Sequence, residues 1–549
     1  MNKLRTLFYV ISLCFSFTLV SAQVTITYPT SRSVFQRNNS NLSTLYIAGN
    51  YTTFADKVEA RVIARTMTPA QGISTNWTTI QVNPANGSYY GSMPVSGGWY
   101  DLEVRCWNGT TLIGSATIQK IGIGEVFLIA GQSNATGDSD LKNQGNYGPM
   151  ANDDRVSVVN YTLSFPINYG AIVLPRAEFT RLDSTFNISP FGVSAWCWGA
   201  LGDTLTKKLN VPIAFFNAGW SGTGAAAWNE SANDSTATPI NFITMPRGMP
   251  YGNLRAALHF YLAQFGARAV LWHQGETDNL QETSRNNYGL YLKNIITKSR
   301  EHSGKSNLAW VVSRATRYKG FQIVNSRTWQ PVIDAQNDVI GLNGTGQVNY
   351  TTHVFEGPKT DSLVGLNIRT SDSIHFVGLG HRILAKEWSL KLNNNFFINS
   401  TPCLPTPPPQ LISNCNGITS LLIQTNNSYS NYLWTNNTEA NNNLSSSSSY
   451  TSSSGSFRLR VKDNLGNILI SPQISIPGNF AGLIPISSAN SGTWHDSSTW
   501  ECNRIPSSVD TVTIKNTHEV IIGSGLTARF KKLDLKGNLR FFSTSKLQN

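Results

Sequence analysis

Apolar and polar residues alternate along the first part of the chain. Val24–Tyr28 and Trp99–Val104 show this alternation, and turn signals such as Ala85-Asn86-Gly87 separate the strand-like runs. Several short strands divided by turns are typical of a β-sandwich. We therefore expect residues 23–120 to form an N-terminal β-sandwich, in which we find no residue cluster typical of catalysis.

The pattern changes over residues 121–398, where strand-like apolar runs alternate with helical spacing. The predicted strands are Val156–Tyr161, Pro212–Asn217, Ala267–His273 and Leu308–Ser313. The predicted helices are Val193–Leu209, Gly252–Phe265, Tyr288–Arg300, Val324–Val339 and Gly378–Leu392. Repeated βα units predict a three-layer α/β domain, in which helices cover both faces of a mostly parallel sheet.

The C-terminal part returns to short strand-like runs. Residues 399–410 are rich in proline and predict a stiff linker. Residues 411–477 predict a β module, with a low-complexity loop at Ser445–Ser456. Residues 480–549 predict a second module of recurring short strands. We see no obvious final element there, so this module could be incomplete.

The N-terminus reads as a secretory signal peptide over residues 1–22. Lys3 and Arg5 precede an apolar run, Leu7–Val20, which ends in the small residues Ser21 and Ala22. A transmembrane anchor is the alternative, but this run is short of the roughly 20 residues that span a bilayer. We therefore expect a soluble protein that is secreted or held at the cell surface.

Length and charge limit the function classes. A chain of 549 residues is too long for one core, so several domains are expected. The net charge of +12 falls to +10 once Lys3 and Arg5 are removed, and no Lys/Arg cluster is present. This pattern does not favour a nucleic-acid partner. Abundant Asn, Ser, Thr and Trp fit contact with sugars, although Asn and Ser also enrich ordinary loops.

The cysteines suggest at most a small disulfide framework. Cys14 leaves with the signal peptide, and the spacing of Cys403 and Cys415 could close a small loop in an exported protein. No CxxC pair or His-x-His cluster indicates a metal site, and we expect no metal and no cofactor.

A candidate nucleophile lies just after a predicted buried strand. The apolar run Val126–Ala130 ends at Gly131, and Ser133 follows two residues later. Open α/β sheets bind their ligands at the carboxyl ends of the strands, which is where Ser133 falls. The alternative is a turn serine that caps the next helix.

Cleavage of an ester by a serine also needs a base and an acid that orients it. His375 lies just before the last predicted helix, and Asp372 lies three residues upstream. A short turn could bring the carboxylate to one imidazole nitrogen and leave the other facing Ser133. Competing histidines of this region are His259, His273 and His381.

The developing oxyanion needs hydrogen-bond donors. The predicted strand Ala267–His273 runs into Gln274, whose side-chain amide could supply one donor. A Gly-rich turn follows an earlier strand, and there we choose Gly222, with Gly219 as the alternative. The backbone N–H of Ser133 would complete the set.

Four blocks in this order resemble the SGNH hydrolases, and more narrowly their sialate O-acetylesterase and carbohydrate acetylesterase branch. The blocks are Gly131-Gln132-Ser133-Asn134, Trp220-Ser221-Gly222-Thr223, Trp272-His273-Gln274-Gly275-Glu276-Thr277-Asp278 and Asp372-Ser373-Ile374-His375-Phe376. The resemblance covers about residues 24–395 and implies a flavodoxin-like hydrolase domain. It implies Ser133 as nucleophile, His375 as base and Asp372 as its partner, with Gly222 and Gln274 as oxyanion donors. The family commonly has Gly-Gly-Thr-Pro where this chain has Ser221-Gly222-Thr223-Gly224, which leaves the donating glycine open.

Other polar and aromatic residues lie near these blocks. Glu276 and Asp278 could bind a substrate hydroxyl, and Glu276 could instead orient His375; we expect both to support the site structurally. Arg255 and Arg314 could hold an acidic sugar, although surface ion pairs are the expected role. Four tryptophans could stack on a sugar or pack in the core: Trp196, Trp198, Trp220 and Trp228.

Taken together, these features predict a secreted serine esterase that removes O-acetyl groups from carbohydrates through an acetyl-Ser intermediate. The substrate could be sialic acid or an acetylated polysaccharide. The C-terminal regions loosely resemble Ig-like modules and adhesin-type repeats, which imply attachment to a cell surface or polysaccharide. The alternatives are a catalytically inactive glycan-binding protein on an esterase scaffold, and an esterase for lipid or peptidoglycan esters.

Overall fold

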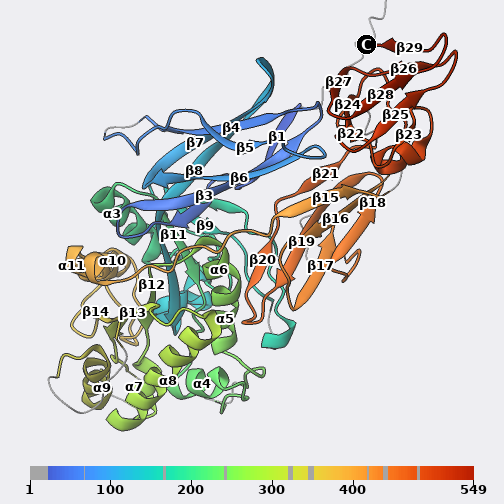
Figure 1. The fold of residues 1–549 in the computed structure, drawn as a ribbon. Helices are drawn as coiled ribbons and strands as arrows, with labels where there is room; N and C mark the ends of the chain where they lie inside the picture. The colour runs from blue at the N-terminus through green and yellow to red at the C-terminus, as the bar shows by residue number, and fades with distance from the viewer. Residues whose placement is uncertain are drawn as a thin grey trace, which may run out of the picture.

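The computed structural model describes residues 23–66, 69–164, 168–239, 244–319, 326–343, 352–416, 420–436, 443–478 and 482–549. The expected signal peptide lies outside these residues. Figure 1 shows N-terminal strands in blue, a helix-rich centre in green and yellow, and C-terminal strands in orange and red. Within the described ranges, no helix combines the length and apolar character needed to span a bilayer.

One long strand, β8 (Thr111–Gly131), links the N-terminal strands to the helix-rich centre. Its first part pairs antiparallel with β7 (Gly98–Asn108). Its last residues lie parallel between β11 (Ile213–Asn217) and β12 (Ala269–His273). The expected domain boundary at residue 120 therefore falls inside a strand, and strands from both regions form one 11-stranded sheet.

The remaining N-terminal strands flank this sheet or form a second one. The large sheet also contains β2 (Val34–Gln36), β4 (Lys57–Ala64) and β5 (Thr78–Val82). The second sheet is antiparallel and contains β1 (Val24–Tyr28), β3 (Leu42–Tyr51) and β6 (Ser88–Ser96). Apolar side chains of both sheets, among them Ile47, Val62 and Trp99, belong to one buried cluster.

The central strands follow the order β10-β9-β11-β8-β12-β13-β14. The strands not yet given are β9 (Val156–Val159), β10 (Phe179–Arg181), β13 (Ala309–Arg314) and β14 (Val354–Lys359). Only β10 runs antiparallel to its neighbour in this series. The strands β9, β10 and β11 lie on one side of β8, and the later strands β12, β13 and β14 lie on the other, so the strand order reverses at β8. A crevice at the carboxyl ends of the strands is expected at such a point.

Helices cover both faces of the sheet because the apolar run in β8 supplies side chains to each face. Phe127 and Ile129 share a cluster with α3 (Trp198–Leu209) and α10 (Leu379–Lys391). Val126, Leu128 and Ala130 share the opposite cluster with α8 and the α5–α6 segment. These elements are α8 (Arg285–Ser303), α5 (Tyr251–Ala256), a π-helical stretch (Ala257–Leu262) and α6 (Ala263–Phe265).

Shorter helices complete the central region. They are α1 (Ser133–Thr136), α2 (Ser139–Asn143), a 3₁₀ turn (Tyr169–Ala171), α4 (Ala225–Ala232), α7 (Glu276–Leu280), α9 (Gln330–Ile340) and α11 (Asn394–Asn399). The helix predicted from Val193 begins only at Trp198, because backbone bonds from Val193 to Thr136 and from Trp196 to Tyr147 hold the preceding segment in a non-helical path. Val324, where a helix was predicted to begin, lies outside the described residues. Among those described, α9 begins at Gln330, with a proline in its first turn, where this residue type is favoured.

The chain beyond residue 399 begins with an extended stretch that reaches two antiparallel sheets. One sheet contains β15 (Leu411–Cys415), β16 (Leu421–Thr425) and β18 (Ser449–Ser452). The other contains β17 (Asn431–Thr435), β19 (Gly455–Lys462), β20 (Ile468–Ile470) and β21 (Ile474–Ile476). Buried side chains between them include Ile423, Trp434 and Leu459.

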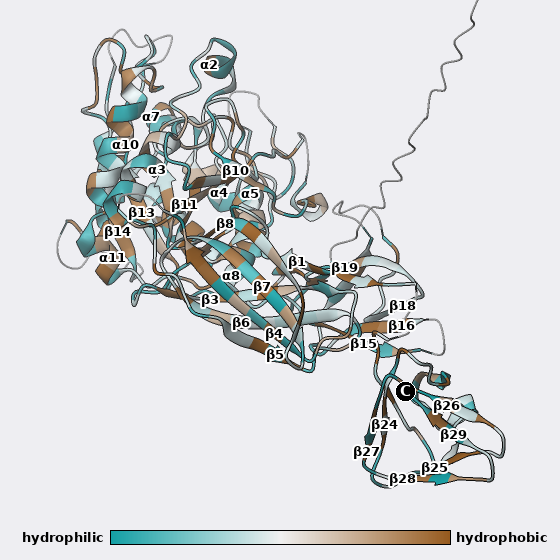
Figure 2. Cartoon of the chain, turned by 90° about the horizontal axis from the view of Figure 1, so that it is seen from above, coloured by the Kyte–Doolittle hydropathy of each residue, from teal (hydrophilic) through white to brown (hydrophobic). Residues whose placement is uncertain are grey.

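The last strands differ because all of their pairings are parallel. They form three short sheets: β22 (Ile486–Ser487) with β24 (Thr511–Ile514) and β27 (Lys532–Leu535); β23 (Gly492–Thr493) with β25 (Glu519–Ile522) and β28 (Asn538–Phe541); and β26 (Thr527–Arg529) with β29 (Lys546–Gln548). Two 3₁₀ turns, Ser497–Thr499 and Glu501–Asn503, lie beside them. Figure 2 shows the sheets as the sides of a triangle, which is the form of a β-solenoid.

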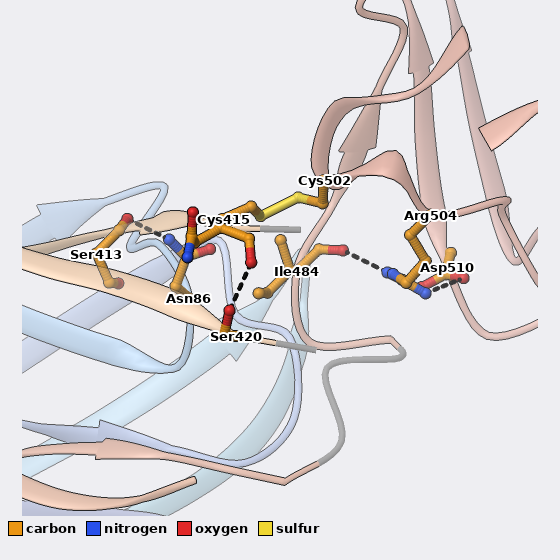
Figure 3. The surroundings of a disulfide bond; sticks show 9 residues. Asn86, Ser413, Cys415, Ser420, Ile484, Cys502, Arg504 and Asp510 are labelled. Atoms are coloured by element: carbon orange, nitrogen blue, oxygen red, sulfur yellow. Dashed lines mark hydrogen bonds and ion pairs between the residues drawn. A yellow bond between two sulfur atoms is a disulfide. The ribbon is translucent and has the colours of Figure 1, made fainter. Parts of the chain in front are cut away.

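A disulfide joins the two C-terminal β regions and corrects the pairing expected from spacing. Cys415 at the end of β15 is bonded to Cys502, which lies 87 residues further along the chain (Figure 3). Cys403 is a buried free thiol, and its backbone pairs with Ala267 of the central region. The proline-rich stretch that follows Cys403 is extended, so it carries Cys415 away rather than folding it back.

Candidate active site

The candidate nucleophile lies on a tight turn at the end of β8. Gly131 has a φ of +127°, and a Cβ atom there would lie 2.0 Å from the carbonyl oxygen of His273, so only glycine fits. The Gln132 N–H donates a hydrogen bond to the same carbonyl, which ties the turn to β12. Ser133 then begins α1, where its own N–H has no acceptor within the helix.

The structure brings the three expected catalytic residues together. His375 Nε2 lies 2.9 Å from Ser133 Oγ, and His375 Nδ1 lies 3.1 Å from Asp372 Oδ2. Ser133 follows β8, whereas Asp372 and His375 lie on the loop between β14 and α10. The competing histidine His259 contacts Tyr169 and His302, and His381 packs against Trp196.

Local hydrogen bonds hold the histidine loop in place. Asp372 Oδ1 accepts from the Ile374 N–H at 2.7 Å and from the Thr370 hydroxyl. Arg369 lies 4.0 Å above the Phe376 ring and donates to the carbonyl oxygens of Thr360 and Ile374. Sequence reasoning missed Arg369, because a single arginine beside a loop forms no recognisable spacing.

The charges around His375 favour its protonated form. Burial lowers the pKa of His375, but the hydrogen bond and charge of Asp372, helped by Asp138 and Glu276, raise it above 6.5 overall. Burial raises the pKa of Asp372, yet its hydrogen bonds from His375 and Thr370 hold it well below its usual range. Asp138 was not predicted, and its Oδ2 lies 3.7 Å from His375 Nε2. Asp372 is therefore ionised, as an orienting partner must be.

Asn134, next to the candidate nucleophile, joins three parts of the site. Its Nδ2 donates to Glu276 Oε1 at 2.7 Å and to the Ile374 carbonyl at 2.8 Å. Glu276 is buried and also lies 3.3 Å from His273 Nε2. Burial raises the pKa of Glu276, but His273 and Asn134 outweigh that effect and lower it. Glu276 thus contacts the nucleophile turn rather than His375.

The side-chain amide of Gln274 contacts more acceptors within the protein than its expected role as an oxyanion donor requires. Its Nε2 lies 2.9 Å from Gln132 Oε1, 2.6 Å from the Thr223 carbonyl and 2.9 Å from Asp278 Oδ2. An amide has two N–H donors, so Gln274 can reach an oxyanion only by releasing one of these acceptors. Its oxyanion role stays a prediction, and the structure adds a bracing role. Burial, aided by Glu276, raises the pKa of Asp278 to about 6.

The Gly-rich turn after β11 offers one open glycine. Gly222 has a φ of +75°, and no atom lies within 4 Å of a Cβ placed there. Gly219 is enclosed, because its N–H donates to Asn217 Oδ1 and its Cβ position is 2.8 Å from Thr136. The Trp220 N–H donates to the Gly131 carbonyl, which fixes the turn beside Ser133.

The structure places the tryptophans and arginines that the sequence analysis considered as sugar contacts. Three tryptophans are fully buried in the core: Trp196, Trp198 and Trp228. Trp220 is 8 % exposed and stacks on Phe191, with ring centroids 4.7 Å apart. Arg255 and Arg314 are buried rather than at the surface, and they pair with Asp234 at 2.6 Å and Glu356 at 2.5 Å. The described ranges contain no group of three His, Cys, Asp or Glu residues placed to hold a metal ion.

Comparisons with known proteins bear on this site. Residues 123–354 match the family model described as carbohydrate esterase, sialic acid-specific acetylesterase. The match confirms the resemblance expected from the sequence blocks and supports carbohydrate esterase activity for this region. It begins inside β8 and ends at the first residue of β14, before Asp372 and His375. A search of curated proteins gives no match.

Three solved structures show a weak likeness. A carbohydrate acetylesterase from Xanthomonas citri is 14% identical, with 82% of this chain and 98% of that chain covered at a TM-score of 0.39. A protein from Arabidopsis thaliana is 17% identical, with coverages of 50% and 98% and a TM-score of 0.31. The salicylyl-acyltransferase SsfX3 of a tetracycline biosynthetic pathway is 9% identical, with coverages of 65% and 82% and a TM-score of 0.27. With TM-scores this low, none of the three carries an argument about this chain.

Proposed function

We propose that this chain is a serine carbohydrate O-acetylesterase that acts through an acetyl-Ser133 intermediate. The observation that carries the proposal is the continuous hydrogen-bonded series from Ser133 Oγ to His375 at 2.9 Å and from His375 to Asp372 at 3.1 Å. This series lies where the strand order reverses, at the carboxyl end of β8. The arrangement matches the requirements of a nucleophile, its base and an orienting acid.

In the first step, Ser133 Oγ attacks the carbonyl carbon of the acetyl ester while His375 Nε2 accepts the hydroxyl proton. The bond from that carbon to the sugar oxygen then breaks, and His375 returns the proton to the leaving sugar. In the second step, His375 takes a proton from water, which attacks the acetyl carbon. Acetate leaves, and the proton returns to Ser133 Oγ.

The oxyanion of each tetrahedral intermediate needs donors that already face it. We assign this role to the N–H groups of Ser133 and Gly222, because one begins a helix and the other lies in an open turn. Gln274 either joins them or acts by holding the Thr223 carbonyl, and therefore the turn that carries Gly222.

The wider role follows from the N- and C-terminal regions. We propose that residues 1–22 direct export, and that the two C-terminal β regions attach the enzyme to a cell surface or polysaccharide. Localisation of the full chain, compared with a chain that lacks residues 1–22, tests the first part. Retention on insoluble polysaccharide with and without residues 411–549 tests the second.

A fluorophosphonate probe tests the chemistry directly, because it reacts only with an activated serine. We expect the probe to label the protein at Ser133, and we expect Ser133→Ala to abolish both labelling and hydrolysis of p-nitrophenyl acetate. Circular dichroism should show an unchanged fold. An unlabelled but folded wild-type protein would instead point to an inactive scaffold, and retention on insoluble polysaccharide would then test whether that scaffold binds glycans.

A further inference from the structure

A row of cations lies where the first C-terminal β region, β15–β21, packs on the central helices. In Figure 1, β20 of this region lies beside α6. The apolar residues at every second position of Phe457–Val461 in β19 belong to the core of the β region. Successive side chains of a strand point to opposite faces, so Arg458, Arg460 and Lys462 share the other face. That face is turned toward the central region.

The Arg460 guanidinium reaches the central region without meeting a carboxylate. Its Nη1 donates to the Leu174 carbonyl at 2.8 Å, and its Cζ lies 5.2 Å from the centroid of the Phe260 ring. Across the described ranges, Arg460 forms no ion pair. A guanidinium has several N–H donors in a planar fork. A single carbonyl therefore leaves most of these donors available to another acceptor.

Arg458 is more deeply buried and has no partner of its own. It is 9 % exposed, and its side chain makes no hydrogen bond or ion pair with the residues that the structure describes. Burial, together with the charge of Arg176, lowers the pKa of Arg458 to about 10, and burial lowers that of Arg460 to about 10. Both side chains stay charged at neutral pH. Buried charges without a counter-charge are costly, so such groups point to an ion that is bound there.

A hollow opens between the two regions at this row. Its volume is about 100 Å³, and its lining includes Tyr169, His259, Phe260, Arg460 and Lys462. Among the described residues that line it there is no aspartate or glutamate. Sites for drug-sized ligands usually measure roughly 300–1,000 Å³. The hollow therefore fits one compact polar group rather than a sugar ring.

The other ionisable groups nearby do not neutralise these cations. His259 Nδ1 lies 2.8 Å from the Tyr169 hydroxyl and Nε2 lies 2.9 Å from the His302 carbonyl, and burial lowers the pKa of His259 to about 4, so this ring is neutral. The Asp463 carboxylate accepts from the backbone and side-chain N–H groups of Asn467 within its own turn. The charge at the hollow is therefore that of its two cations.

We propose that this hollow binds a small oxyanion, held by the guanidinium of Arg460 and the ammonium of Lys462. A carboxylate, sulfate or phosphate group accepts several hydrogen bonds from a guanidinium fork at once. The anion offsets the charge of the row and ties the first C-terminal β region to the central region. A free inorganic anion and the carboxylate of an acidic polysaccharide both supply this chemistry. The inference goes beyond the proposed esterase function, because the hollow shares no residue with the candidate catalytic site.

Hydrogen exchange of the full-length protein tests the site, with inorganic phosphate as the probe and chloride at equal ionic strength as the reference. The peptide that covers β19 and β20 reports on the hollow. We expect its exchange to slow about tenfold when phosphate is present at about ten times its dissociation constant, because the anion binds only the docked state. A peptide that covers β25 should not change, which controls for the general stabilisation that phosphate gives to folded proteins.

Two variants and a matched control assign the effect to the cations. Lys462→Gln removes an exposed side chain, so the fold should be retained, and we expect it to weaken phosphate binding about tenfold. Arg460→Gln should abolish the protection. Arg540→Gln is the control, because Arg540 also lies over a phenylalanine ring, 5.3 Å from the centroid of Phe542, but on the exposed strand β28. This control should bind phosphate as the wild type does.

Polygalacturonate in place of phosphate distinguishes the two sources of the anion. Protection of the β19–β20 peptide by phosphate supports a site that is open to free anions. Protection by the polymer alone supports the same site with the carboxylate of an acidic polysaccharide as its ligand. Protection by neither probe, or equal protection in the wild type and Lys462→Gln, rejects the inference. None of these readouts depends on turnover, so the esterase proposal stands or fails separately.

Discussion

Replacing Gln274 with alanine is the sharpest test of how the site is built. The Gln274 Nε2 faces three acceptors, one each from Gln132, Thr223 and Asp278, and the Gln274 side chain is fully buried. Alanine removes two N–H donors, so the Thr223 carbonyl loses its partner, whereas Gln132 Oε1 and Asp278 Oδ2 keep the N–H groups of Thr277 and Ala225. Each unsatisfied buried group costs about 1–3 kcal/mol, and more when it is charged. We therefore expect a loss of stability of about 1–3 kcal/mol in this part of the protein.

The loss should depend on pH through Asp278. Its pKa of about 6 in the folded protein lies above the ordinary carboxyl value of 3.8, so the protonated form is favoured by folding. The stability from this group is fully present below its unfolded pKa and is lost as the pH rises through 6. Without the amide of Gln274, the ionised carboxylate is still less favourable. The destabilisation should therefore be larger at pH 8 than at pH 5.

Hydrogen exchange of the peptide that covers β12 and α7 measures this local stability. A loss of about 1–3 kcal/mol corresponds to about 5- to 150-fold faster exchange. Gln330→Ala, on an exposed glutamine of α9, is the control and should leave this peptide unchanged. Unaltered exchange together with a hundredfold lower kcat would refute the bracing role and leave Gln274 as an oxyanion donor alone.

Three further predictions concern the base His375, the buried ion pair between Arg268 and Glu125, and the disulfide between Cys415 and Cys502. The kcat/KM for p-nitrophenyl acetate should rise with pH and level off only above pH 6.5, because neutral His375 is the active base and its pKa is raised. Asp372→Asn should move this inflection to lower pH and reduce kcat about 10⁴-fold. An unchanged pH profile in this variant would contradict the assignment of Asp372. Arg268→Met should cost about 3–5 kcal/mol in urea unfolding, because it removes a partner at 2.8 Å from the buried carboxylate of Glu125; a change below about 1 kcal/mol would show that the remaining donors suffice. Cys502→Ser should destabilise the C-terminal solenoid by about 4 kcal/mol toward proteolysis without altering esterase turnover; equal proteolysis of both proteins would exclude this coupling.

The central fold could be predicted because its strands are continuous apolar runs that end in glycine or polar turns. Val126–Ala130 and Ala267–His273 are both of this kind, and in the structure they are adjacent parallel strands. Residues that follow such strands meet at one edge of the sheet, which is why Ser133 and Gln274 could be placed there. His375 was assigned instead from its position just before the last predicted helix and from the family resemblance. The strand β14 was missed because its sequence, Val354–Lys359, contains a glycine and a proline and lacks a continuous apolar run.

Other parts of the site depend on tertiary contacts that have no local signal. Asp138 and His375 come from separate segments of the chain and lie 3.7 Å apart, and Arg369 braces the loop through the carbonyl oxygens of Thr360 and Ile374. The partner of Cys415 lies in another module, so the short spacing to Cys403 pointed to the wrong cysteine. These side chains have no periodic pattern, and only the packed chain places them.

Because β8 is continuous, the central region cannot be excised at residue 123, where the match to the family model begins. A protein begun near residue 123 would lose β7 and β2, which pair with the first part of this strand, and with them the Gln36 and Arg37 side chains that bind Glu125. Glu125 would then keep Arg268 but lose its other two donors, and a partly unpaired buried carboxylate would destabilise the sheet that carries Ser133. The N-terminal strands therefore support the strand that ends at Ser133, and a shortened protein for expression should retain them.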